Sequence, residues 1–143
     1  MKLSSLIFGT FFALAAIAAV LWVLGFGFHT PPSAQGSALY NPADEIAIKG
    51  VVQDIQDFDC PVSDFELSRH LMVKTADETV EVHLAPTRIL QGQKLSFSPG
   101  EHVEIVGSKI RLAGKDGVIV RELTRGNETV TFRDREGKLL LTQ

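Results

Sequence analysis

The sequence has few of the residues that most often mark a chemical site. Among its 143 residues it contains one cysteine, Cys60, together with one tryptophan and one tyrosine. A lone cysteine forms no internal disulfide, so an apolar core must hold the folded part together. No CxxC or HExxH spacing marks a zinc site, no GxSxG marks a serine hydrolase, and no glycine-rich loop followed by Lys-Ser or Lys-Thr marks a nucleotide site.

Positive charge is also scarce. The chain has 14 Lys and Arg against 17 Asp and Glu. Without Lys2, the remainder carries 13 bases and 17 acids, a net charge of −4. Nonspecific nucleic-acid binding needs several bases on phosphates and aromatic side chains for stacking, and aromatics are few outside the N-terminus. We therefore expect no nucleic-acid partner.

Charge is missing altogether from residues 6–28, an apolar run of 23 residues. At about 1.5 Å per residue a helix of this length crosses a hydrocarbon core of roughly 30 Å. A cleavable signal peptide has an apolar core of about 7–15 residues, so residues 1–28 predict an uncleaved transmembrane signal anchor. Cleavage near Ala38 is the alternative. Lys2 precedes the run and no base follows until Lys49, which predicts a single-pass protein of the cell membrane with its C-terminal domain outside the cytoplasm, periplasmic or extracellular.

Residues 29–44 are rich in Pro, Ser, Gly and Ala and predict a flexible linker. From residue 45 to residue 143, short alternating apolar segments separated by turn signals predict an all-β domain. Gly50 interrupts the first segment, which indicates a bulge or a sharp bend. One helical turn is expected within residues 86–95. Strands are expected at residues 45–56, 70–76, 79–85, 101–107, 118–123 and 128–134.

Residues 70–85 are predicted to form a hairpin that turns across residues 77–78. Matching its apolar faces sets Lys74 opposite Glu81, an opposite-charge pair worth about 0.2–1 kcal/mol. In that register the two histidines lie diagonally on the outer face, about 7–8 Å apart between Cα atoms. We expect this outer face, with a loop at residues 57–69, to bind a ligand or partner. Its residues are His70, Met72, Lys74, Glu81 and His83.

The segments of this domain resemble an OB-fold, a small five- to six-stranded β-barrel whose closure removes open sheet edges. An N-terminal anchor before such a barrel is similar to the haem chaperones of cytochrome c maturation. Those proteins attach haem through a late histidine near a tyrosine, whereas here no histidine follows His102 and the tyrosine is Tyr40, so that activity is not implied. The pattern CP…HL…VHL…P also resembles uncharacterised bacterial envelope proteins. The residues of the OB resemblance are "IKGVVQDI", "HLMVKTADETVEVHLA", "PGEHVEIVGSKI" and "GVIVREL".

Two interpretations of function follow. The first is a binding module without catalytic activity or cofactor, whose partner is an envelope protein, an envelope polymer or a small ligand. The alternative is a metal- or cofactor-handling envelope protein, of a copper or haem-related kind, that uses Cys60, His70 and His83; thiol and imidazole groups suit copper(I) or zinc. A cysteine nucleophile is not expected, because Asp59 opposes formation of the Cys60 thiolate. The ordinary alternative is that the histidines lie on an exposed strand face and that Cys60 is a small, partly buried strand end.

Overall fold

The computed structural model describes residues 39–142. The predicted anchor over residues 1–28, the alternative cleavage near Ala38 and most of the predicted linker over residues 29–44 lie outside this part of the chain. Within residues 39–142, no helix is long and apolar enough to cross a membrane.

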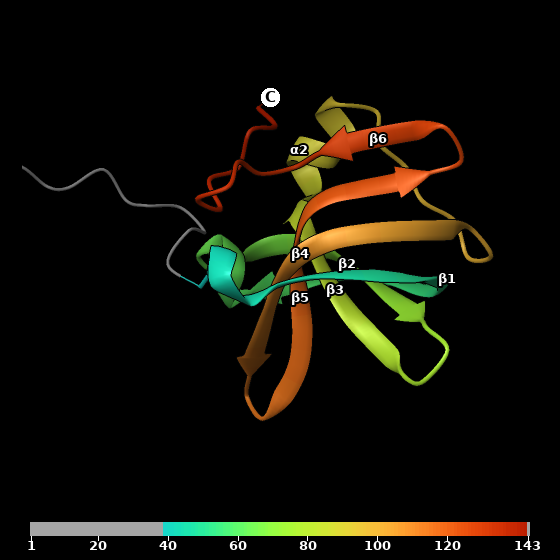
Figure 1. Ribbon diagram of the computed structural model, residues 1–143. Coiled ribbons are helices and arrows are strands. Elements are labelled where there is room, and N and C mark those ends of the chain that lie inside the picture. Colours follow the sequence, from blue (N-terminus) through green and yellow to red (C-terminus); the bar gives the residue numbers. More distant parts are fainter. Residues whose placement is uncertain (1–38, 143) are drawn as a thin grey trace, which may run out of the picture. The chain divides into compact units, whose positions relative to one another are not determined.

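Six strands make up the described domain, which confirms the predicted all-β fold (Figure 1). They form one sheet in the order β3-β2-β1-β4-β5-β6, with antiparallel pairing between all neighbours. Two 3-10 turns and one short helix, the latter within the stretch where a helical turn was predicted, connect the strands. The elements are η1 (Pro42–Asp44), β1 (Glu45–Cys60), η2 (Pro61–Ser63), β2 (Glu66–Lys74), β3 (Thr79–Pro86), α2 (Thr87–Gly92), β4 (His102–Leu112), β5 (Lys115–Arg125) and β6 (Glu128–Thr131).

A further pairing joins the two ends of the run β3-β2-β1-β4-β5. β3 and β5 run parallel over three residue pairs, from Glu81 with Gly117 to His83 with Ile119. The first and last strands of this run are therefore hydrogen-bonded to each other. Their paired N–H and C=O groups would be exposed if both strands were open edges. The same pairing places β5 beside the second half of the predicted hairpin.

β1 serves two partners along its length. Residues 45–51 pair with β4, and residues 51–60 pair with β2. The change occurs at Val51, directly after Gly50, where a Cβ atom would lie 2.3 Å from the main-chain oxygen of Lys74, so only glycine permits this approach. A bulge follows between Val52 and Asp54. The irregularity predicted from Gly50 is confirmed.

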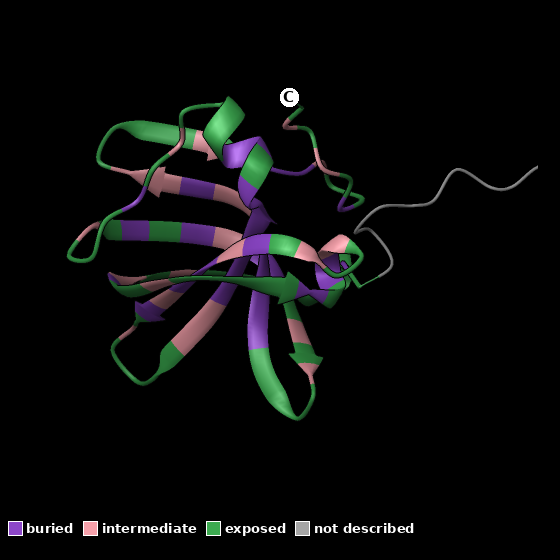
Figure 2. Ribbon diagram, turned by 180° about the vertical axis from the view of Figure 1, so that it is seen from behind, coloured by how far each residue is buried: buried purple, intermediate pink, exposed green. Residues whose placement is uncertain are grey.

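The inward-facing side chains form one main apolar cluster. Buried positions alternate with exposed positions at the start of β4, as expected when side chains point to opposite faces in turn, whereas β3 and β5 contain runs of consecutive buried residues (Figure 2). Each fully buried large side chain contributes about 1.5–3 kcal/mol relative to exposure. The largest members are Phe132, Leu71, Leu84, Leu90, Ile105 and Leu123.

The predicted hairpin register is wrong by two residues. Lys74 pairs with Thr79, and Met72 pairs with Glu81. The reason is the turn: the hydroxyl of Thr75 donates to the main-chain oxygen of Glu78 at 2.9 Å and accepts from the Glu78 N–H at 3.1 Å, which makes a four-residue loop in place of a two-residue one. A shift of two residues keeps every side chain on its predicted face.

The predicted loop at residues 57–69 is also corrected. β1 continues to Cys60, and β2 begins at Glu66, so only residues 61–65 connect them. Arg69 donates two hydrogen bonds of 2.8 Å to Asp57 across the paired strands. Since β1 is longer than predicted, Cys60 lies on a strand that is hydrogen-bonded to the hairpin.

Candidate functional site

The structure brings Cys60, His70 and His83 together from three strands. Cys60 is the last residue of β1, while His70 in β2 and His83 in β3 lie directly opposite each other. The Cys60 Sγ atom is 3.3 Å from His83 Nδ1, and the centroids of the two imidazole rings are 4.5 Å apart. The sulfur and one nitrogen from each ring all lie within 4.8 Å of one another. We call these three residues the Cys-His-His cluster.

All three side chains of the Cys-His-His cluster are buried. Relative exposure is 1% for Cys60, 0% for His70 and 6% for His83. The expectation of histidines on an exposed strand face is therefore wrong. Two features cover this face: the Phe58 ring lies 3.8 Å from the His70 ring between centroids, and β5 pairs with β3 beside His83. The pattern of alternation identified the face correctly, but closure of the sheet buried it.

One nitrogen of the cluster has no partner. The carboxylate of Glu81 lies 2.9 Å from His70 Nδ1, which is a hydrogen-bonding distance. The other ring nitrogen, His70 Nε2, is buried and has no hydrogen-bond partner within the described domain. A carboxylate that accepts from one imidazole nitrogen leaves the other as a lone-pair donor, the arrangement found around metal-bound histidines.

Electrostatics keep the Cys-His-His cluster uncharged in the absence of a ligand. Burial lowers the pKa of His83 to about 3, with His70 and Arg133 adding to the effect. Burial also lowers the pKa of His70, against the opposing influence of Glu81. The pKa of the Cys60 thiol is raised, chiefly by burial and further by the charge of Glu81. Burial therefore favours the protonated thiol of Cys60 over the thiolate, which is the nucleophilic form.

A buried arginine lies against the same strands. Arg133 is 3% exposed and donates hydrogen bonds to the main-chain oxygens of Leu84 and Val120, at 2.7 and 2.8 Å. Leu84 directly follows His83 in β3. Within residues 39–142 no carboxylate forms an ion pair with Arg133, and burial lowers its pKa to about 10. The interior therefore holds a cation whose counter-charge is not supplied by a neighbouring acid.

A cleft leads from the surface to the cluster. Its volume is about 240 Å³, and Glu81 and His83 lie in its wall. Gly117 lines the cleft too, and a Cβ atom there would lie 3.0 Å from His83 Nε2, so this glycine leaves room for the ring. The remaining lining residues are Phe58, Pro61, Leu112, Ala113, Lys115 and Asp116.

The remaining members of the predicted binding surface do not join the cluster. Lys74 is exposed at the turn end of the hairpin and pairs with Thr79. Met72 is half-buried opposite Glu81 and supplies none of the three ligand atoms. Glu81 is on the predicted face but interacts with His70 in place of Lys74. For Met72 and Lys74, binding of a ligand or partner stays a prediction.

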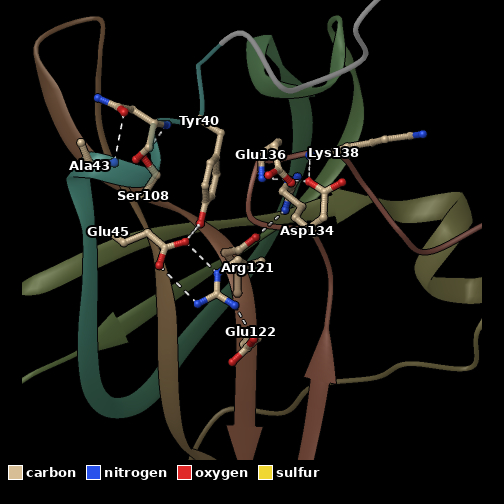
Figure 3. A network of polar contacts seen from close by, with 12 residues as sticks. Tyr40, Ala43, Glu45, Ser108, Arg121, Glu122, Asp134, Glu136 and Lys138 are labelled. Carbon is tan, nitrogen blue, oxygen red and sulfur yellow. Dashed lines mark hydrogen bonds and ion pairs between the residues drawn. The ribbon is translucent and has the colours of Figure 1, made fainter.

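A second polar group, which we call the Tyr40 network, lies nearby, since Tyr40 and Cys60 belong to one buried apolar cluster (Figure 3). Glu45 accepts from the Tyr40 hydroxyl and from Arg121 Nε at 2.7 Å, and Arg121 also contacts Glu122. Arg121 and Tyr40 hold the pKa of Glu45 below its ordinary value, Arg121 having the larger influence. Burial and the Glu45 hydrogen bond raise the pKa of Tyr40 to about 12. Here the charged groups are mutually paired, which is typical of a structural network.

Sequence reasoning missed Arg133 and Gly117, and it misassigned Glu81. Arg133 lies within the last predicted strand, at residues 128–134, but it was not among the candidate site residues. The segment "TVTFRD" gave only a weak signal for Arg133. Strand alternation puts Phe132 and Arg133 on opposite faces of the chain, and this pattern alone does not predict that both are buried. For Gly117 no local signal distinguishes a glycine beside a histidine ring from a turn glycine.

Fold and site together define an all-β domain with a buried cluster of one cysteine and two histidines. Residues 45–130 match the MamS/MamX magnetosome protein family, and the chain belongs to this family. The matched residues include Cys60, His70 and His83.

No curated protein matches the sequence. Among solved structures, the chain is similar to one in the "Crystal structure of S. pombe Stn1-ten1 complex", with 18% sequence identity and a TM-score of 0.44. The likeness covers 59% of this chain and 59% of that chain, so it spans less than two thirds of the structure matched.

Proposed function

We propose that this member of the magnetosome family is a non-catalytic metal-binding protein whose Cys-His-His cluster holds one transition-metal ion. The observation that carries the proposal is the convergence of three buried ligand atoms within 4.8 Å of one another. Of the two interpretations drawn from the sequence, the geometry supports the metal-handling one best.

The dimensions of the cluster fit a metal ion. Ligand atoms bound at about 2.0–2.3 Å to one ion lie at most about 4.5 Å apart, so a small shift of the rings closes the site. The Cys60 Sγ to His83 Nδ1 separation of 3.3 Å is already in that range. His70 Nε2 is a buried acceptor without a hydrogen-bond partner among residues 39–142, and such a group costs roughly 1–3 kcal/mol unless a ligand engages it.

The chemistry of the donors selects the class of metal. One thiolate and two imidazoles suit copper and zinc, whereas magnesium and calcium prefer oxygen ligands. Glu81 would orient His70 through Nδ1, and the cleft beside His83 would give the ion a path from solvent. Catalysis is not part of the proposal, because burial favours the protonated thiol over the nucleophilic thiolate.

Membrane anchoring through residues 1–28, an extracytoplasmic location and an OB-like barrel belong to this proposal as well. The uncharged run of 23 residues supports the anchor, and membership of a magnetosome protein family is consistent with association with a membrane. The parallel pairing of β3 with β5 supports a closed barrel. Removal of residues 1–28 should move the protein from the membrane fraction to the soluble fraction; a truncated protein that stays with the membrane would contradict the anchor.

Metal content tests the binding proposal. The full-length protein, purified in detergent, is exposed to copper or zinc, desalted and analysed for metal per chain. We expect one ion per chain in the unchanged protein and less than a tenth of that after His70→Ala or His83→Ala. His102→Ala is the matched control, since His102 is exposed and begins β4, and it should keep full loading. Equal metal content in all four proteins, or none in the unchanged one, would refute the proposal.

A further inference from the structure

We propose that the Cys-His-His cluster takes copper in its monovalent state, and that the buried guanidinium of Arg133 sets this preference. The inference rests on the proposed metal-binding function and specifies the ion that the site accepts. Its basis is the balance of charge among the groups that surround the cluster.

Ligand type narrows the choice to two ions but does not decide between them. A thiolate and two imidazoles form a soft donor set, which suits copper(I), and the same donors occur at zinc sites. A structural zinc site takes four protein ligands, and a three-ligand site keeps a fourth position for water. The described chain brings three ligand atoms together. Three donors are sufficient for copper(I), which accepts low coordination numbers.

The charges around the cluster distinguish the two ions. With a metal bound, Cys60 contributes one negative charge as thiolate, Glu81 contributes another, and Arg133 contributes one positive charge. The sum is −1, so a monovalent ion makes the enclosed group neutral, whereas a divalent ion leaves it at +1. Asp57 is matched by the two hydrogen bonds from Arg69, and Lys115 and Asp116 in the wall of the cleft carry opposite charges, so these groups do not alter the count. An uncompensated charge inside a protein is unfavourable, so neutrality favours the monovalent ion.

Arg133 is fixed in position for this role. Its hydrogen bonds to the main chain at Leu84 and Val120 hold the guanidinium against β3, which contains His83, and β5, which pairs with β3 at His83. No carboxylate within residues 39–142 pairs with it, so its charge acts on the cluster without local neutralisation. A guanidinium also stays protonated at any ordinary pH, which makes it a permanent charge.

Metal competition on the full-length protein tests the inference. The unchanged protein is titrated with copper(I) under a reductant and with zinc, each against a chelator of known affinity. We expect one copper(I) per chain and an affinity for copper(I) well above that for zinc. Arg133→Met should raise zinc affinity by about tenfold or more, because it removes one like charge from the surroundings of the site, with a smaller change for copper(I). Arg133→Lys retains the charge and should retain the preference.

The outcomes separate this inference from the function on which it rests. Zinc bound at Cys60, His70 and His83 as tightly as copper(I) overturns the inference and leaves metal binding in place. An Arg133→Met protein with both affinities changed equally also overturns it. Absence of any metal at the three residues overturns the proposed function itself. If Arg133→Met does not fold, the competition on the unchanged protein and on Arg133→Lys decides.

Discussion

The two polar groups of this domain differ in how completely their members are satisfied. In the Tyr40 network, Glu45 is matched by a hydroxyl and a guanidinium, and Arg121 is matched by two carboxylates (Figure 3). In the Cys-His-His cluster, one buried nitrogen of His70 has no partner. A satisfied network stabilises the fold and has no capacity left for a ligand. A buried group with a free acceptor retains that capacity.

The two groups also differ in the charge state that their surroundings favour. Pairing with Arg121 favours ionised Glu45 and so lowers the pKa of its carboxyl. Burial favours the neutral forms of His83 and Cys60, lowering the pKa of the first and raising that of the second. Neutral imidazole is the form that binds metals, whereas a cysteine must lose its proton as the metal arrives. Ionised pairs indicate stability here, and buried neutral ligands indicate binding.

The largest effect is expected from Cys60→Ser. The hydroxyl is nearly the same size as the thiol but is a far weaker ligand for copper or zinc, so metal affinity should fall by more than about 100-fold. Stability of the metal-free protein should change by about 1 kcal/mol or less. Metal titration and urea unfolding followed by far-ultraviolet circular dichroism measure the two effects. An unchanged affinity would show that the cysteine is only a core residue.

A smaller loss is expected from Glu81→Gln, which weakens the contact that orients His70. Groups that orient a metal-bound histidine contribute about 10–100-fold to affinity. Glu78→Gln is the control, because Glu78 is exposed in the hairpin turn and takes part there through its main chain. If both variants bind metal equally well, Glu81 does not position His70.

For the Tyr40 network we predict the opposite result, a loss of stability without a loss of metal affinity. Glu45→Gln removes the charge that faces Arg121 and should lower the free energy of unfolding by about 1–2 kcal/mol, the usual worth of a hydrogen bond to a charged group in a partly exposed position. Metal affinity should stay within twofold of the unchanged protein, since Glu45 is not part of the cluster. If Glu45→Gln lost metal binding but kept its stability, the Tyr40 network would be a binding site and not a structural network.

Acid should affect the same network by a smaller amount. Because the pKa of Glu45 is lower in the folded state than its ordinary value of 4.5, the unfolded chain takes up this proton first as pH falls. The contribution of Glu45 is therefore complete above about pH 4.5 and is lost below it. Urea unfolding of the metal-free protein from pH 6 to pH 3 should show a steeper loss for the unchanged protein than for Glu45→Gln. Parallel curves would contradict the lowered pKa.

Local pattern predicted much of the fold. Two-residue alternation identified the strands, and Gly50 indicated an irregularity in β1. The outer face of the hairpin was assigned correctly because a register shift of two residues leaves every side chain on the same face. The register failed at Thr75, whose side chain builds its own turn through Glu78. The hydrogen bonds of the Thr75 hydroxyl favour the four-residue loop over a two-residue loop. The alternation of apolar residues fits either loop, so it does not predict which one forms.

The site was predicted in composition but not in environment. Cys60, His70 and His83 were the candidate ligands from the sequence, and the structure places them together. Their burial depends on the parallel pairing of β3 with β5, which joins residues about 36 positions apart. No local pattern in the sequence indicates a pairing of this length. The role of Arg133 depends on the same closure. Long-range pairing decides whether polar residues on a strand face meet solvent or one another.

X-ray absorption at the metal edge of the copper-loaded, full-length protein would identify the ligands of the ion. We predict one ion per chain with one sulfur at about 2.3 Å and two imidazole nitrogens at about 2.0 Å, and loss of the sulfur contribution in Cys60→Ser. A spectrum with oxygen ligands alone, or one identical in Cys60→Ser, would contradict it.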